Sequence, residues 1–139
     1  MGALAVLGIV EFEGEERAVT AARRYARRLL EQEGIEDWEA SLVVTELAAN
    51  AVAYGGSGKF GLAVSVNEDF VRIEVGDSGP GRELRVKKAG EEDEDGRGLL
   101  LVDGLARRWG AVCGETGTTV WVELERRPAS SGVVEEAGR

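Results

Sequence analysis

The pair of polar residues most suited to chemistry is Glu46 and Asn50, which stand four residues apart in the segment TELAANAV. In a helix this spacing places both side chains on one face, one turn apart. The amide oxygen of Asn50 could bind Mg²⁺, which needs few protein ligands when phosphate oxygens and water supply the rest. The carboxylate of Glu46 could orient or deprotonate a nucleophile. A polar helix edge without function is the alternative interpretation.

A second candidate begins at Asp77, which ends an alternating apolar run and precedes Ser78-Gly79-Pro80-Gly81. Its carboxylate can accept hydrogen bonds, for instance from the exocyclic amine of a base. Glycine at 79 and 81 permits unusual backbone angles and the close approach of a ligand. The alternative interpretation is a simple Gly-Pro turn after a strand.

Two segments further along the chain could contribute to the same kind of site. The run Gly96-Arg97-Gly98-Leu99 opens a predicted helix, where free N–H groups and the helix dipole attract phosphate. The alternative is a flexible linker before an amphipathic helix. Near the last predicted strand, the hydroxyl of Thr119 could meet a base or could simply reflect strand propensity.

The common nucleotide-binding loops are missing from the sequence. Gly56-Ser57-Gly58-Lys59 resembles a phosphate loop, but Ala53 and Phe60 break the required pattern. Gly79-Pro80-Gly81 begins like a dinucleotide fingerprint, but Leu84 stands where that fingerprint needs a small residue. Neither fold is supported.

Composition narrows the function further. The chain of 139 residues suits one domain, and its net charge of −9 makes DNA or RNA an improbable partner. Without histidine it has no Ser-His-Asp triad, and the single Cys113 excludes a disulfide framework. The apolar start, residues 1–10, is too short to span a bilayer and lacks a basic leader. We therefore expect a cytoplasmic protein that is not in a membrane.

Hydrophobic periodicity predicts an α+β fold: a two-layer sandwich with helices on one face of a mixed, mainly antiparallel sheet. We expect one domain over residues 1–125 and a disordered tail over 126–139. The predicted elements are strands at 4–12, 60–66, 70–76, 109–113 and 118–124, helices at 15–33, 37–54 and 97–108, and an acidic loop at 77–96. The residues expected to face inward are Ala18, Ala22, Tyr25, Leu29, Leu42, Thr45, Ala49, Val52, Leu100, Leu101, Val102 and Leu105.

Taken together and in order, the candidate segments resemble the GHKL ATPases, which include gyrase, histidine kinases and MutL. The matching segments are TELAANAV, VGDSGPG, GRGLLLV and GTTVWVEL, and the resemblance covers about residues 10–125. Within that superfamily the chain looks like the short anti-sigma factor serine/threonine kinases. The resemblance implies a Bergerat-type ATP-binding sandwich.

The resemblance also implies a role for each matching position. Asn50 would bind Mg²⁺, and Glu46 would be the general base on a protein hydroxyl or water. Asp77 would accept a hydrogen bond from the adenine amino group, with Thr119 near the base. Residues 82–96 would form a lid over the nucleotide. The remaining ATP-binding residues would be Gly79, Gly81, Gly96, Arg97, Gly98 and Leu99.

Two features depart from the family pattern: Tyr54 stands where relatives often have histidine, and the lid is acidic over residues 91–95. The first hypothesis is a kinase that transfers the γ-phosphoryl group of ATP to a small antagonist protein and sequesters a sigma factor, possibly as a homodimer. The second is a nucleotide-dependent protein-binding module with negligible catalysis. The third is an α+β interaction domain without a ligand.

Overall fold

A computed structural model describes residues 2–55, 58–78, 94–115 and 117–129, with only the backbone described at 94–98. These residues form five strands and three helices, each within about three residues of its predicted bounds. In chain order the elements are β1 (Ala5–Glu13), α1 (Arg17–Gln32), α2 (Trp38–Tyr54), β2 (Lys59–Val66), β3 (Phe70–Asp77), α3 (Glu94–Leu105), β4 (Arg108–Gly114) and β5 (Gly117–Glu125).

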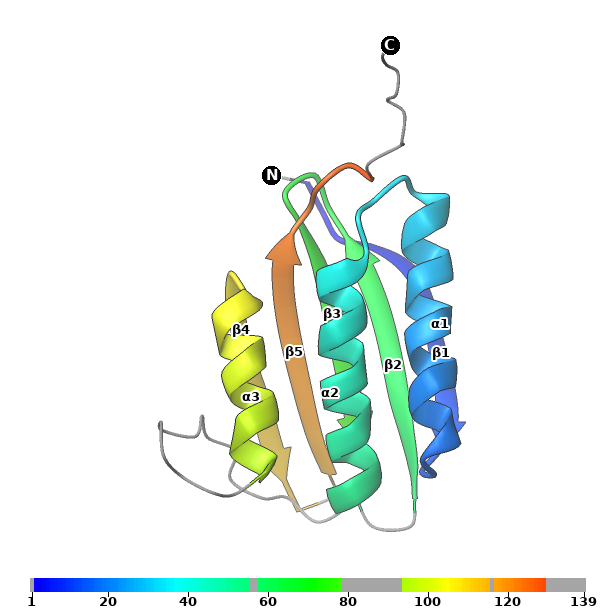
Figure 1. Ribbon diagram of the computed structural model, residues 1–139, viewed down its shortest axis with the longest axis vertical. Helices are drawn as coiled ribbons and strands as arrows, with labels where there is room; N and C mark the ends of the chain where they lie inside the picture. The colour runs from blue at the N-terminus through cyan, green and yellow to red at the C-terminus, as the bar shows by residue number, and fades with distance from the viewer. Residues whose placement is uncertain (1, 56–57, 79–93, 116, 130–139) are drawn as a thin grey trace.

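The strands form one antiparallel sheet in the order β1-β2-β3-β5-β4. All three described helices lie on the same face of this sheet, with α2 between α1 and α3 (Figure 1). The predicted two-layer α+β architecture is therefore confirmed. Along β3 and β5, side chains alternate between the helix-covered face and the open face, as the pleat requires.

The inward face of α2 differs from the prediction. Leu42 is 41% exposed and Ala49 is exposed, whereas Leu47 is only 2% exposed. The helix carries apolar residues around most of its circumference, so several stripes fit the helical period and spacing alone chose the wrong one. The residues that α2 buries are Ala40, Val43, Val44, Leu47, Ala48 and Ala51.

The other two helices need smaller corrections. In α1 the buried side chains include the predicted Ala18 and Ala22, but also Ala26 and Leu30; Tyr25 and Leu29 are only partly buried. In α3 the buried residues are Leu99 and Val102, while Leu100 and Leu101 are exposed. Each predicted stripe was thus displaced around the helix by about one residue, which is a rotation of roughly 100°.

The predicted tail is held in place at its beginning. The backbone N–H of Glu36 donates to the carbonyl of Arg127 at 2.8 Å, and the N–H of Ala129 donates to the carbonyl of Gly34 at 2.8 Å. Residues 126–129 therefore pair with the connection between α1 and α2, contrary to the prediction of a disordered tail from residue 126. The rest of that predicted tail, 130–139, lies outside the described residues.

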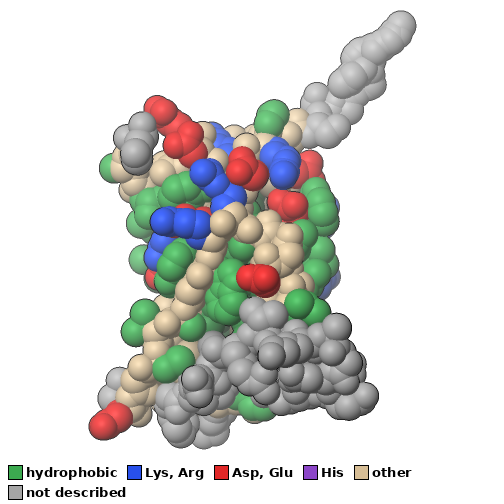
Figure 2. All heavy atoms as spheres, turned by 90° about the vertical axis from the view of Figure 1, so that its left-hand side faces the viewer, with side chains coloured by type: hydrophobic (Ala, Val, Ile, Leu, Met, Phe, Trp, Pro, Cys, Tyr) green, Lys and Arg blue, Asp and Glu red, His purple; other side chains and the backbone are tan. Residues whose placement is uncertain are grey.

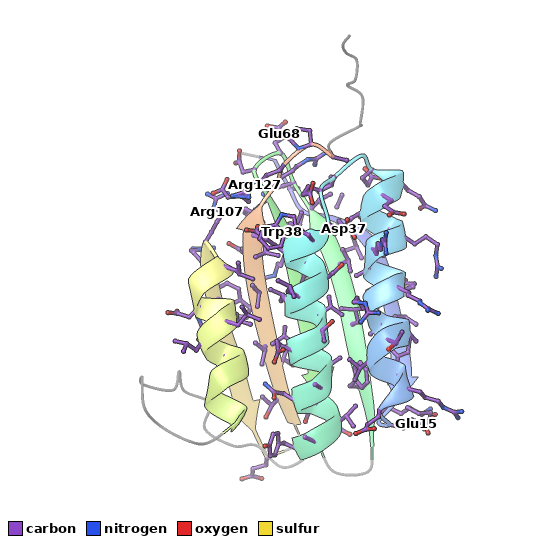
Figure 3. All side chains as sticks on the ribbon, in the orientation of Figure 1. Glu15, Asp37, Trp38, Glu68, Arg107 and Arg127 are labelled. Carbon is purple, nitrogen blue, oxygen red and sulfur yellow. The ribbon has the colours of Figure 1, made fainter. Side chains whose placement is uncertain are left out.

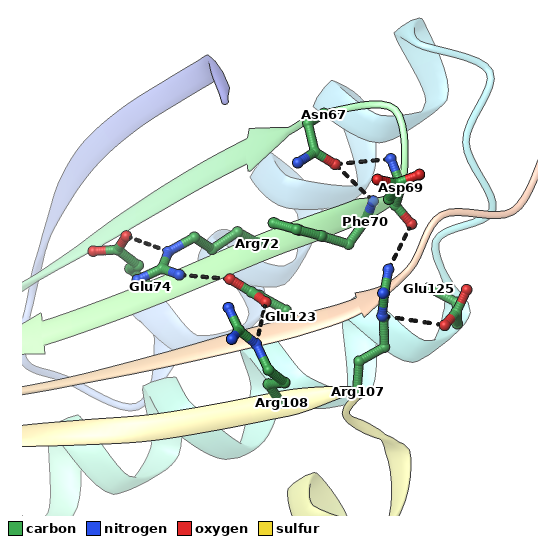
Figure 4. A network of polar contacts seen from close by, with 9 residues as sticks. All are labelled: Asn67, Asp69, Phe70, Arg72, Glu74, Arg107, Arg108, Glu123 and Glu125. Carbon is green, nitrogen blue, oxygen red and sulfur yellow. Dashed lines mark hydrogen bonds and ion pairs between the residues drawn. The ribbon is translucent and has the colours of Figure 1, made fainter. Parts of the chain in front are cut away.

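On the open face of the sheet, Glu123 is a buried carboxylate held by two arginines (Figure 4). It accepts hydrogen bonds from Arg72 at 2.7 Å and from Arg108 at 3.0 Å. Burial opposes the charge of Arg72, yet hydrogen bonds to Glu74 and Glu123 raise its pKa above the ordinary value. The guanidinium of Arg72 also lies over the ring of Trp121, at 4.6 Å from its centroid. Figure 2 shows charged side chains of both signs close together in the upper part of the adjoining edge.

The observed burial of α2 leads to a prediction about stability. Leu47→Ala should lower the free energy of unfolding by about 2–5 kcal/mol, because it leaves a cavity in the core. Leu42→Ala, on the same helix, should lower it by less than about 1 kcal/mol. Urea denaturation of both variants measures the difference, and a larger loss for Leu42→Ala would contradict the observed orientation of α2.

Candidate functional site

The C-terminal end of α2, the end of β3 and the start of β5 meet at one end of the molecule (Figure 1). Glycines make this approach possible. A Cβ on Gly55 would lie 2.9 Å from the Cβ of Asp77, and a Cβ on Gly117 would overlap the carbonyl oxygen of Asp77. A Cβ on Gly58 would lie 2.7 Å from the hydroxyl oxygen of Ser78. Larger residues would force the three segments apart.

Asp77 and Thr118 are direct partners across β3 and β5. Both share the strand face of the buried Val75 and Val120, so both side chains belong to the helix-covered side of the sheet. Thr118 is only 2% exposed, and its hydroxyl oxygen is buried without a hydrogen-bond partner. An unsatisfied buried hydroxyl costs about 1–3 kcal/mol, so such a group calls for an explanation, and a ligand that pairs with it is one.

Thr119, the residue selected from the sequence, points the other way. It is the partner of Gly76 in the ladder, and a Cβ on Gly76 would lie 3.0 Å from its hydroxyl oxygen on the open face. Its side chain therefore does not share a face with Asp77, which corrects the predicted placement near the base. The period of two along Thr118, Val120 and Val122 was the signal that could have identified the right threonine.

Glu46 and Asn50 are half-buried on α2. The flank of α2 that faces α1 carries Ser41 and Thr45; by helical geometry Glu46 and Asn50 lie on the other flank, the side on which α3 packs (Figure 1). Within the described part of the chain, neither the carboxylate nor the amide has a hydrogen bond or an ion pair. Both groups are therefore available to a ligand at this end of the helix.

The other predicted site residues are described only in part. Gly79, Gly81 and positions 82–93 of the predicted lid lie outside the described residues. Gly96, Arg97 and Gly98 fall within the first turns of α3, which begins at Glu94 rather than at the predicted Arg97. Leu99 is buried, with 1% of its surface exposed.

The donor chemistry at this end of α2 fits Mg²⁺ bound together with a polyphosphate. Over residues 2–55, 58–78, 94–115 and 117–129, no three or more Asp, Glu, Cys or His residues gather as a metal cluster. The amide oxygen of Asn50 is a hard ligand of the kind that Mg²⁺ accepts when phosphate oxygens and water complete its shell. Separately, no helix in the described part of the chain is long and apolar enough to cross a membrane.

Comparison with known structures supports the fold. A chain containing the RsbU and RsbW domains of Rv1364c from Mycobacterium tuberculosis matches with a TM-score of 0.63 and 20% identity, over 88% of this chain and 33% of that one. This chain thus spans about a third of the length of that relative. The histidine kinase domain of Erythrobacter litoralis EL346 matches with a TM-score of 0.47 and 26% identity, over 62% of this chain and 42% of that one. Histidine kinase AdeS of Acinetobacter baumannii gives 0.49 and 16%, over 86% and 68%.

Comparison by sequence identifies the family. No curated protein matches the chain. The model of the histidine kinase-like ATPase domain matches residues 12–124, which includes Glu46, Asn50, Asp77 and Thr118. That span is most of the chain and all of the elements from α1 to β4. The chain therefore belongs to the histidine kinase-like ATPase domain family.

Proposed function

We propose that this protein binds Mg-ATP and acts in the cytoplasm as a regulatory serine/threonine kinase of the anti-sigma factor type. The observation that carries the proposal is the unpaired buried hydroxyl of Thr118 beside Asp77. It lies at the same end of the molecule as the helix that bears Glu46 and Asn50. The acceptor would be a hydroxyl of a small antagonist protein.

The base-binding part of the proposed site consists of Asp77 and Thr118. The carboxylate of Asp77 accepts a hydrogen bond from the exocyclic amine of adenine. The hydroxyl of Thr118 supplies a donor and an acceptor in a place closed to solvent, where a polar contact with the base is strongest. Gly117 and Gly55 allow the backbone to approach this pair closely.

The phosphate-binding part of the proposed site consists of Asn50 and Glu46. When bound, Mg-ATP supplies the phosphoryl group and the charge neutralisation that its transfer requires. The amide of Asn50 holds the metal through its oxygen. The carboxylate of Glu46, one turn earlier on the same flank, takes the proton of the acceptor hydroxyl. Because phosphoryl transfer depends mainly on positioning, a rigid helix is a suitable element to carry both groups.

Two observations support a protein partner. The match to a chain that contains an RsbW domain, and the small size of this chain, fit a domain that acts on another protein. The proposed partners are a sigma factor and its small antagonist protein. The catalytically silent binding module remains the alternative, and the enzymatic experiment below separates the two.

The two adjacent threonines allow a matched test of the base-binding site. Thr118→Val removes the unsatisfied hydroxyl and keeps the side-chain shape, so it should raise the free energy of unfolding by about 1 kcal/mol. The same change should weaken Mg-ATP binding at least about fivefold, because a contact to the base is lost. Thr119→Val on the open face should leave affinity unchanged. Calorimetric titration and thermal unfolding measure both quantities, and loss of affinity only in Thr119→Val would overturn the assignment.

The phosphate-binding site has a test of its own. Glu46→Gln should leave Mg-ATP affinity within about threefold and slow ADP formation by about 10²–10⁴-fold, as expected when a general base is removed. Glu39→Gln makes the same charge change at the other end of α2 and should have no effect on the rate. Asn50→Ala should lose the magnesium-dependent part of the affinity.

Chromatographic measurement of ADP, in the presence and absence of Mg²⁺, follows these rates. A wild type that binds Mg-ATP tightly but forms no ADP would contradict the kinase and favour the binding module. A Glu46→Gln variant as active as the wild type would contradict the role of that carboxylate.

A further inference from the structure

A groove of about 540 Å³ runs between α1 and α2 on the helical side of the molecule, on the opposite flank of α2 from Glu46 and Asn50. We call it the α1–α2 groove. Arg23 and Arg27 of α1 form one wall, and Trp38, Ser41, Leu42 and Thr45 of α2 form the other. Asp37 closes the end at the start of α2, next to Trp38 (Figure 3).

The α2 wall presents a strip of apolar surface to solvent. Trp38 is 52% exposed and Leu42 is 41% exposed. They stand four residues apart, so they lie one above the other on one face of the helix. Large apolar side chains that gather at a groove, rather than singly on a surface, are typical of a binding site.

The α1 wall is basic, although the chain as a whole carries a net charge of −9. Arg27 pairs with Glu31 at 3.0 Å and lies 3.5 Å from Asp37, so the acidic end of the groove is already neutralised. Arg23 is half-buried and, among the residues described, makes no hydrogen bond or ion pair. It is therefore an uncompensated cation that faces the groove.

We propose that the α1–α2 groove docks an amphipathic helix of a partner protein, with apolar residues on Trp38 and Leu42 and a carboxylate on Arg23. The walls favour a helix because they are two adjacent helices whose lining residues repeat at a spacing of four, the spacing of helix-in-groove recognition. The positive wall selects an acidic helix. It disfavours a second copy docked groove to groove, since a two-fold contact would place Arg23 against the basic wall of its partner.

The test starts from a displayed library of random peptides of about 15 residues, long enough for a short helix. Selection on the folded wild-type protein should enrich peptides with Leu or Phe at a spacing of three or four and with flanking Asp or Glu. The enriched peptides are then synthesised with a fluorophore and titrated by anisotropy. Arg23→Glu should weaken their binding at least about tenfold, and so should raising the salt concentration from low to about 1 M.

Matched variants separate docking from other effects. Arg28→Glu makes the same charge change at an exposed position outside the groove and should change affinity by less than about twofold. Leu42→Ala should weaken binding while the protein keeps its melting temperature. Arg23→Glu should still bind Mg-ATP like the wild type, so failure of the groove and failure of the nucleotide site are distinguishable.

Three results would overturn the proposal. The first is a selection that enriches no acidic amphipathic peptides. The second is enriched peptides that bind Arg23→Glu as tightly as the wild type. The third is a dimer in sedimentation experiments that Trp38→Ala dissociates, because the groove would then be covered by a second copy of the chain.

Discussion

The burial of one face of α2 against the middle of the sheet is the constraint on which the remaining structure depends. Val43, Leu47 and Ala51 face the core over about two turns, and the core includes Ile73 and Val122 of the central strands β3 and β5. Each large aliphatic side chain buried in this way contributes about 1.5–3 kcal/mol. With this face fixed, the helix cannot rotate, so its two flanks and its C-terminal end have set positions relative to the sheet.

Each flank of α2 then carries a different polar surface. The flank toward α3 bears Glu46 and Asn50, and the flank toward α1 forms part of the α1–α2 groove with Trp38 and Leu42. The unpaired hydroxyl of Thr118 fits the same account, because a fold that keeps an unsatisfied buried group gives up stability at that point. Such local conflicts between stability and structure are expected at functional sites.

The sequence predicts the elements well because alternation and helical periodicity are local signals, and they place Glu46, Asn50 and Asp77 on the right elements. It fails where the answer depends on partners far along the chain. The error at Thr119 is a slip of one residue, and such a slip moves a side chain to the other face of a sheet. The pairing of Ile35 with Pro128 joins distant segments, so no local pattern announces that the tail is held.

The most direct test of the nucleotide site is an amide chemical-shift titration of the isotopically labelled protein with Mg-ATP. We predict that the shifts concentrate at Glu46, Asn50, Asp77 and Thr118, with the indole signal of Trp38 in the groove unmoved. Shifts confined to the α1–α2 groove or to the open face of the sheet, with the end of α2 unperturbed, would contradict the account.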